Sequence, residues 1–217
     1  MKKINILFDL DGTLIDSTDA ILESFSVAYS NMNRDKPTDE DIKSQIGYPL
    51  DLMFSALGVE DEDIEEFVYQ YKMHYRKINQ KKTRLLPQAK ESIIEAYKIA
   101  NLAVVTTKTS KYSIELLKHL EIYNYFDVFI GRDDVENPKP HKEPILKALK
   151  GLNNSYPSWM IGDTCLDMLS AKGANINSIA VTCGYATISN LKECSDMIRG
   201  STLEAVKEIQ LHTESNK

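Results

Sequence analysis

The 217-residue chain has no excess of positive charge and no long apolar run. Its 26 lysines and arginines against 32 acidic residues leave a formal net charge of −6, which argues against nonspecific binding to nucleic acid or to an anionic membrane. No stretch reaches the roughly 18 consecutive apolar residues of a membrane span. The short apolar run behind the basic start meets two aspartates and does not have the form of a signal peptide. We therefore expect a cytoplasmic protein that binds neither nucleic acid nor membrane.

Cysteine is also scarce, and Cys165, Cys183 and Cys194 have no CxxC spacing. An odd number of cysteines without an export signal predicts reduced thiols, with Cys165 as a small packing residue. The hydrophobic fraction of 42% and the charged fraction of 27% are ordinary for a globular protein. A chain of this length fits one large domain, or a core with an insert.

The most informative stretch is an apolar run, residues 4–8, that leads into Asp9-Leu10-Asp11-Gly12-Thr13. The run is typical of a buried strand, and because side chains alternate along a strand, Asp9 and Asp11 are predicted to point to the same side. Unpaired charges are costly to bury, so either a bound cation or a shared proton is expected at this pair. Gly12 is expected to allow a sharp turn after the strand.

The rest of the chain shows two kinds of pattern. Helical periodicity without a convincing strand covers residues 16–83, which predicts an all-helical insert. From Pro87 onward, short apolar stretches alternate with helical segments, a pattern typical of a mostly parallel sheet covered on both faces. The predicted core strands after the first are residues 102–106, 126–130, 159–162, 178–182 and 197–198.

These patterns predict an α/β fold in two parts. A three-layer Rossmann-like core with a mostly parallel sheet is expected from residues 1–15 and 84–217. Residues 16–83 are expected to form a small all-helical cap domain. In such sheets, ligands bind at the carboxyl ends of the strands.

Polar residues follow the predicted core strands at their carboxyl ends. Thr106 ends one strand, and Asp163 follows another. Asp167 comes one helical turn after Asp163, so both carboxylates can face the same point. Lys139 lies between two prolines, which restrict the backbone on either side of it. We expect these side chains to converge near Asp9.

The segments resemble, in order, the four motifs of the haloacid dehalogenase-like phosphatases. The resemblance covers nearly the whole chain, and the helical insert is similar to the family's cap between motifs one and two. Within the superfamily, the chain is most similar to the phosphoglycolate phosphatase group. The matching positions are Asp9-Leu10-Asp11-Gly12-Thr13, Thr106, Lys139, and Gly162-Asp163-Thr164 with Asp167.

The resemblance implies a phosphatase mechanism. Asp9 would attack phosphorus and form an aspartyl-phosphate, which splits one difficult step into two. Asp11 would protonate the leaving oxygen and then deprotonate the water that cleaves the intermediate. Thr106 would donate a hydrogen bond to a phosphoryl oxygen, and Lys139 would offset the negative charge.

The implied cofactor is Mg²⁺, for which oxygen ligands are suitable. Asp9 and Asp163 would bind it together with the backbone carbonyl of Asp11. Asp167 would complete the metal site, either directly or through water, although it could instead favour the N-terminus of its helix.

The implied substrate is a small phosphorylated metabolite such as phosphoglycolate. Thr107 replaces a usual asparagine, and its backbone N–H can still bind the phosphate. In the insert, the loop that carries Gln45 and Tyr48 resembles the family's specificity loop, so both are candidate contacts with the organic part of the substrate. Tyr48 could instead pack between cap helices. A monomer or a homodimer is expected.

Several other functions stay open at this point. Pyrophosphate, a nucleotide or a sugar phosphate could be the substrate. A phosphosugar mutase on the same scaffold would retain its phosphoenzyme until a sugar accepted the group, but Thr13 and the residues after it favour the phosphatase. Dehalogenases and phosphonatases usually lack an acid at the position of Asp11. The intact set of acids argues against an inactive binding module.

Overall fold

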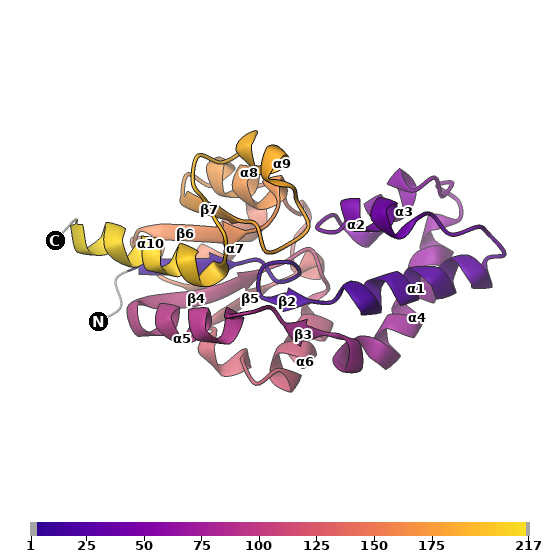
Figure 1. Ribbon diagram of the computed structural model, residues 1–217, viewed down its shortest axis with the longest axis horizontal. Coiled ribbons are helices and arrows are strands. Elements are labelled where there is room, and N and C mark those ends of the chain that lie inside the picture. The colour runs from indigo at the N-terminus through magenta and orange to yellow at the C-terminus, as the bar shows by residue number, and fades with distance from the viewer. Residues whose placement is uncertain (1–3, 216–217) are drawn as a thin grey trace. The chain divides into compact units, whose positions relative to one another are not determined.

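The computed structural model describes residues 4–215, and its main feature is a six-stranded sheet in the order β5-β4-β1-β6-β7-β8 (Figure 1). All five pairings between neighbours in this sheet are parallel. A second sheet consists of β2 and β3. The strands are β1 (Ile4–Phe8), β2 (Ile15–Asp16), β3 (Arg84–Leu85), β4 (Ala100–Val105), β5 (Val128–Ile130), β6 (Ser158–Gly162), β7 (Asn177–Val181) and β8 (Ile198–Arg199).

Helices cover both faces of the large sheet, so the core has three layers. One apolar cluster joins the sheet to α5 and α10, and another joins its opposite face to α7 and α8. The predicted α/β class with a parallel sheet is therefore confirmed. The core helices are α5 (Ala89–Ile99), α6 (Ser110–His119), α7 (Glu143–Gly151), α8 (Cys165–Gly173), α9 (Ile188–Lys192) and α10 (Thr202–Ser215), with 3-10 turns at Tyr123–Tyr125 and Arg132–Asp134.

The alternation of side chains along β1 decides which helices pack on which face. Ile6 and Phe8 lie in one cluster with Ile93 of α5, whereas Leu7 lies in the other with Ile145 of α7. All five residues of β1 are buried. A strand that is buried on both faces needs a nearly continuous apolar run, which is the pattern seen in the sequence.

The register of β1 with its two neighbours brings three strand ends together. Phe8 lies opposite Val104 of β4 and opposite Ile161 of β6. The next residue, Asp9, donates its backbone N–H to the carbonyl of Ile161 at 2.9 Å. The carboxyl ends of β4, β1 and β6 therefore meet at one edge of the sheet.

The chain forms two compact units, residues Met1–Asp16 with Leu85–Lys217, and residues Ser17–Arg84. The second unit is helical, and aromatic rings fill its interior. The ring of Phe54 lies 4.7 Å from that of Phe25 and 5.3 Å from that of Phe67, measured between centroids. Its helices are α1 (Thr18–Asn31), α2 (Asp39–Ser44), α3 (Leu50–Ala56) and α4 (Ile64–Lys82).

The prediction of three reduced cysteines is wrong for two of them. Cys165, at the start of α8, forms a disulfide with Cys194, 29 residues further along the chain and just after α9. Cys183 is a free thiol. Cys165 is therefore more than a small packing residue. The pairing could not be predicted because it depends on α9, a five-residue helix without an apolar periodicity of its own.

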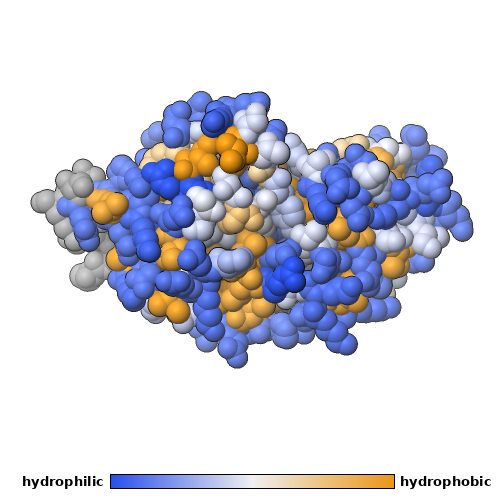
Figure 2. Space-filling model, in the orientation of Figure 1, coloured by the Kyte–Doolittle hydropathy of each residue, from blue (hydrophilic) through white to orange (hydrophobic). Residues whose placement is uncertain are grey.

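On the face shown in Figure 2, hydrophilic residues predominate, and apolar residues form smaller patches between them. Among residues 4–215, no helix is both long enough and apolar enough to cross a membrane.

Candidate active site

The candidate site lies at the carboxyl edge of the large sheet. Asp9 directly follows β1, Thr106 follows β4, and Asp163 follows β6. All three residues are buried. Because these strands are parallel neighbours, their ends place residues from distant parts of the sequence side by side.

Lys139 connects the acids at this edge. Its ammonium donates to Oδ1 of Asp9 at 2.7 Å, to Oδ1 of Asp167 at 2.6 Å and to the carbonyl of Val105 at 3.0 Å. Only 3% of the side chain is exposed. A lysine is rarely buried unless it is paired, and here three acceptors satisfy its three N–H groups.

Further hydrogen bonds hold the other two carboxylates. Asp163 accepts from the hydroxyl of Thr13 at Oδ1, at 3.0 Å, and from the backbone N–H of Tyr185 at Oδ2, at 2.9 Å. Asp167 uses its second oxygen to accept from the hydroxyl of Thr164 at 2.8 Å and from the backbone N–H of the same residue at 3.2 Å. Donors from the protein itself therefore hold these carboxylates in place.

Two glycines allow the backbone to approach Asp163. Gly12 has a φ of +81°, in the left-handed region that glycine adopts most easily, and a Cβ added there would lie 2.2 Å from Oδ2 of Asp163. A Cβ at Gly184 would lie 2.0 Å from the same oxygen. The sharp turn expected at Gly12 is confirmed. A side chain at this position would also collide with Asp163, which is a second reason for glycine here.

The buried acids and Lys139 shift one another's pKa values. Burial raises the pKa of Asp9 from 3.8 to about 7, with Lys139 opposing the rise and Asp167 adding to it. Burial, together with the charges of Asp9 and Asp167, raises the pKa of Asp163 well above its ordinary value. Burial would lower the pKa of Lys139, but the two carboxylates it contacts outweigh that effect and raise it. Negative charge is therefore in excess at this site.

The same residues fit a divalent cation. One carboxylate oxygen from each of Asp9, Asp163 and Asp167 lies within 4.8 Å of the others. Carboxylates are the hard oxygen donors that Mg²⁺ prefers, and three of them against the single ammonium of Lys139 leave negative charge for a cation to offset. The side chain of Asp11 is not part of this group, and the predicted role of its backbone carbonyl stays a prediction.

Asp11 has a different partner. Its Oδ2 lies 3.2 Å from the ammonium of Lys108, which follows β4. The backbone N–H of Lys108 donates to Oγ1 of Thr106 at 3.2 Å. The hydroxyl proton of Thr106 can therefore point to another acceptor. Lys108 is a site residue that the sequence did not single out.

Comparison with known proteins identifies the family. Residues 6–181 match the family model described as haloacid dehalogenase-like hydrolase. The chain is a haloacid dehalogenase-like hydrolase. A curated relative from Dickeya dadantii named "Probable phosphatase IndB" is 33% identical over 214 residues, which cover 93% of this chain and 90% of the relative. Pyrophosphatase PpaX from Halalkalibacterium halodurans is 35% identical, with 86% of each chain covered.

Solved structures agree with the fold of this haloacid dehalogenase-like hydrolase. A haloacid dehalogenase-like family protein from Streptococcus pneumoniae has a TM-score of 0.84 and 29% identity, with 94% of this chain and 97% of that chain covered. A predicted phosphoglycolate phosphatase from Haemophilus somnus has a TM-score of 0.85 and 25% identity, with 96% and 98% covered. The resemblance stated from the motifs is therefore confirmed at the level of the family.

Three further residues were predicted to contact the substrate. Thr107 lies in the loop after β4, next to Thr106. Gln45 and Tyr48 belong to the helical unit, where Tyr48 donates its backbone N–H to the carbonyl of Gln45 at 3.1 Å. Their predicted contacts with substrate stay predictions.

Some site residues were missed from the sequence. Thr13 stands inside the first motif, so its position could have suggested a role beside Asp163. Tyr185 acts through its backbone N–H, which no residue type reveals. Lys108 follows Thr106 by two positions, and only the fold shows that it meets Asp11.

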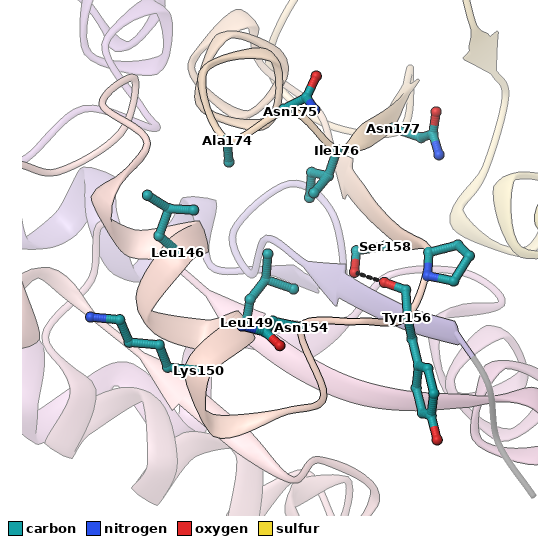
Figure 3. A pocket seen from close by; sticks show the side chains of 11 residues that line it. Leu146, Leu149, Lys150, Asn154, Tyr156, Ser158, Ala174, Asn175, Ile176 and Asn177 are labelled. Atoms are coloured by element: carbon teal, nitrogen blue, oxygen red, sulfur yellow. Dashed lines mark hydrogen bonds between the residues drawn. The ribbon is translucent and has the colours of Figure 1, made fainter.

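A pocket of about 450 Å³ lies at the amino ends of β6 and β7 (Figure 3), whereas the candidate active site lies at the carboxyl ends of the strands. It is lined by segments that lead into β6 and β7, including Tyr156 and Ile176, and by Leu149 and Lys150 of α7. Ser158 donates to the carbonyl of Tyr156 at 2.9 Å within it. None of the acids of the candidate site lines this pocket, so the pocket and the predicted chemistry are separate.

Proposed function

We propose that this hydrolase is a Mg²⁺-dependent phosphatase that acts on a small phosphorylated substrate through an aspartyl-phosphate on Asp9. The observation that supports this most directly is the buried group of Asp9, Asp163 and Asp167 around Lys139 at the carboxyl edge of the sheet. Phosphoryl transfer depends mainly on positioning and on compensation of charge, and this group supplies both.

The first half of the proposed reaction forms the intermediate. A carboxylate oxygen of Asp9 attacks phosphorus while the bond from phosphorus to the leaving oxygen breaks. The electron pair of that bond goes to the leaving oxygen, which takes a proton from Asp11. Lys139 stays beside Asp9 and offsets negative charge as the phosphoryl group arrives.

The second half returns the enzyme to its starting state. Asp11 takes a proton from water as the water oxygen attacks phosphorus. The bond between phosphorus and Asp9 breaks, its electron pair returns to the carboxylate, and inorganic phosphate leaves. Thr106 donates its hydroxyl proton to a phosphoryl oxygen, and the backbone N–H of Thr107 serves the same group.

Mg²⁺ would be held by Asp9, Asp163 and the backbone carbonyl of Asp11, with Asp167 beside it. Bound there, it would supply positive charge to the phosphoryl oxygens. Asp167 accepts hydrogen bonds from Lys139 and from Thr164, and it would therefore also orient that lysine beside the metal.

The helical unit is proposed to select the organic part of the substrate, with Gln45 and Tyr48 as the residues to test. A phosphoglycolate-like monoester is the first candidate, from the motif resemblance. Inorganic pyrophosphate is the second, because the relative from Halalkalibacterium halodurans bears the name pyrophosphatase. A cytoplasmic monomer or homodimer stays the expected form.

A phosphate-release screen tests this function. Purified protein is given phosphoglycolate, pyrophosphate, nucleotides and sugar phosphates, each with Mg²⁺ or with a chelator, and substrates are ranked by kcat/KM. We expect Mg²⁺-dependent release that returns when the chelated protein receives Mg²⁺. Phosphate release that is unchanged by the chelator would show that the reaction does not need the metal. A phosphoenzyme stable for many seconds, with turnover stimulated by sugar, would favour the mutase.

A further inference from the structure

The site contains a second lysine that the proposed catalytic roles do not use. The ammonium of Lys108 lies 3.2 Å from Oδ2 of Asp11. Lys139 instead contacts Asp9 and Asp167, at 2.7 and 2.6 Å. The two lysines therefore serve different acids, one beside the proposed nucleophile and the other beside the proposed proton donor.

The backbone of Lys108 is held on both sides. Its N–H donates to Oγ1 of Thr106 at 3.2 Å, and its carbonyl accepts from the N–H of Arg132 at 3.0 Å. Gly131 packs so closely that a Cβ there would lie 2.6 Å from the carbonyl of Lys108. The side chain of Lys108 thus extends from a backbone that is held in place, which is what a residue that orients a ligand requires.

The position of this cation matters for the leaving group, and the inference rests on the proposed function. If Asp11 gives its proton to the leaving oxygen, a cation beside Asp11 lies on the leaving-group side of phosphorus. An alcohol that receives this proton departs without charge. A leaving group with a phosphate or carboxylate of its own keeps negative charge, which an ammonium attracts.

We propose that Lys108 is a specificity-determining residue that contacts the leaving group and selects substrates whose leaving group is an anion. Pyrophosphate releases a phosphate, and phosphoglycolate releases a carboxylate-bearing alcohol, so both belong to this class. Sugar and glycerol phosphates release neutral alcohols and do not. A contact with Lys108 would thus favour pyrophosphate and phosphoglycolate over sugar and glycerol phosphates.

Lys108→Met tests the proposal, because it removes the charge and keeps most of the length of the side chain. Lys108→Arg keeps the charge. Lys98→Met is the matched control, since Lys98 is exposed on α5 next to the opposite end of β4 and pairs with Glu95. Values of kcat/KM are measured with Mg²⁺ for pyrophosphate, phosphoglycolate and glycerol 3-phosphate.

We expect Lys108→Met to lower kcat/KM for the two anionic-leaving-group substrates by about 10- to 100-fold, the usual effect of one charge-assisted contact. The value for glycerol 3-phosphate should change less than about threefold, and Lys108→Arg should recover much of the loss. Loss for only one of pyrophosphate and phosphoglycolate would overturn the selection of anionic leaving groups as a class. The control should behave like the wild type.

Equal losses on all three substrates would make Lys108 a positioning residue for Asp11 and overturn the proposal, as would no loss at all. A wild-type protein that hydrolyses glycerol 3-phosphate better than either anionic substrate would also overturn it, and would leave the phosphatase function standing. If no substrate releases phosphate, the proposed phosphatase function is wrong, and the inference about Lys108 is wrong with it. Circular dichroism and thermal unfolding of each variant separate a change in activity from a change in folding.

Discussion

The ammonium of Lys139 lies 2.7 Å from Oδ1 of Asp9, although the two residues are 130 positions apart in the chain. The same ammonium contacts Asp167, and both partners are buried. A buried charge is costly unless it is paired, so this lysine and these acids stabilise one another.

Replacing Asp9 by Asn should abolish turnover and leave the fold intact. The amide cannot attack phosphorus, so kcat should fall by at least about 10³-fold. Because burial already raises the pKa of Asp9 to about 7, a neutral side chain should be tolerated there. Phosphate release and thermal unfolding are measured, with the exposed Asp196 replaced by Asn as the control. Substantial remaining activity would contradict the assignment of the nucleophile.

Replacing Lys139 by Met should both destabilise the protein and stop the reaction. The variant keeps three buried carboxylates without their ammonium, and removing one partner of a buried ion pair typically costs about 3–5 kcal/mol. Urea unfolding measures the loss, and added Mg²⁺ should recover part of it because a cation would again offset the acids. A variant as stable as the wild type in the presence of a chelator would show that the lysine is not needed to balance this charge.

The metal-free protein should lose stability as the pH rises from about 4 to about 7. The pKa of Asp9 is about 7 in the folded protein against an ordinary 3.8, so the folded state binds this proton more tightly than the unfolded state. The stabilising contribution is complete below the ordinary pKa and is lost as the pH passes about 7. Asp163 shifts in the same direction, whereas the raised pKa of Lys139 acts above this range.

Thermal unfolding with a chelator and with Mg²⁺, over about pH 5 to about pH 8, checks this pH dependence. The stabilisation by Mg²⁺ should grow with pH, because the metal needs deprotonated carboxylates. The Asp9→Asn variant isolates the contribution of this residue and should show a flatter pH dependence without metal. A Mg²⁺ effect that is the same at every pH would contradict binding at these acids.

Gly12→Ala and Gly58→Ala form a matched pair. Both glycines have positive φ angles, +81° and +83°, so backbone strain alone should cost each variant about 1 kcal/mol of stability. A Cβ at Gly12 would meet Asp163 at 2.2 Å, whereas nothing lies within 4 Å of a Cβ at Gly58. Activity should therefore fall sharply in Gly12→Ala and be retained in Gly58→Ala. Equal activity in the two variants would show that the position of Asp163 is not critical.

The purified protein should have one titratable thiol per chain when it is unfolded without reductant, and three after reduction. Cys183 provides the first, and the Cys165–Cys194 pair provides the others. Thiol titration and mass spectrometry of peptides measure both states. In a Cys194→Ser variant the count without reductant should rise from one to two, since Cys165 loses its partner. Three thiols without reductant in the wild type would contradict the disulfide.

The fold class and the centre of the site could be predicted because they depend on local patterns. An apolar run buried on both faces has few alternatives to a central parallel strand, and Asp9 directly after it must reach the carboxyl edge. The strand ends at Thr106 and Asp163 were predictable in the same way.

The sequence by itself determined most of the core strands, the family motifs and the types of residue at each strand end, because periodicity and residue chemistry are local properties. Only the tertiary structure decided which distant groups meet: Lys108 with Asp11, Thr13 and the backbone of Tyr185 with Asp163, and Cys165 with Cys194. Such contacts depend on the order and register of strands and on how loops turn, and no spacing in the chain encodes a contact between residues brought together by packing.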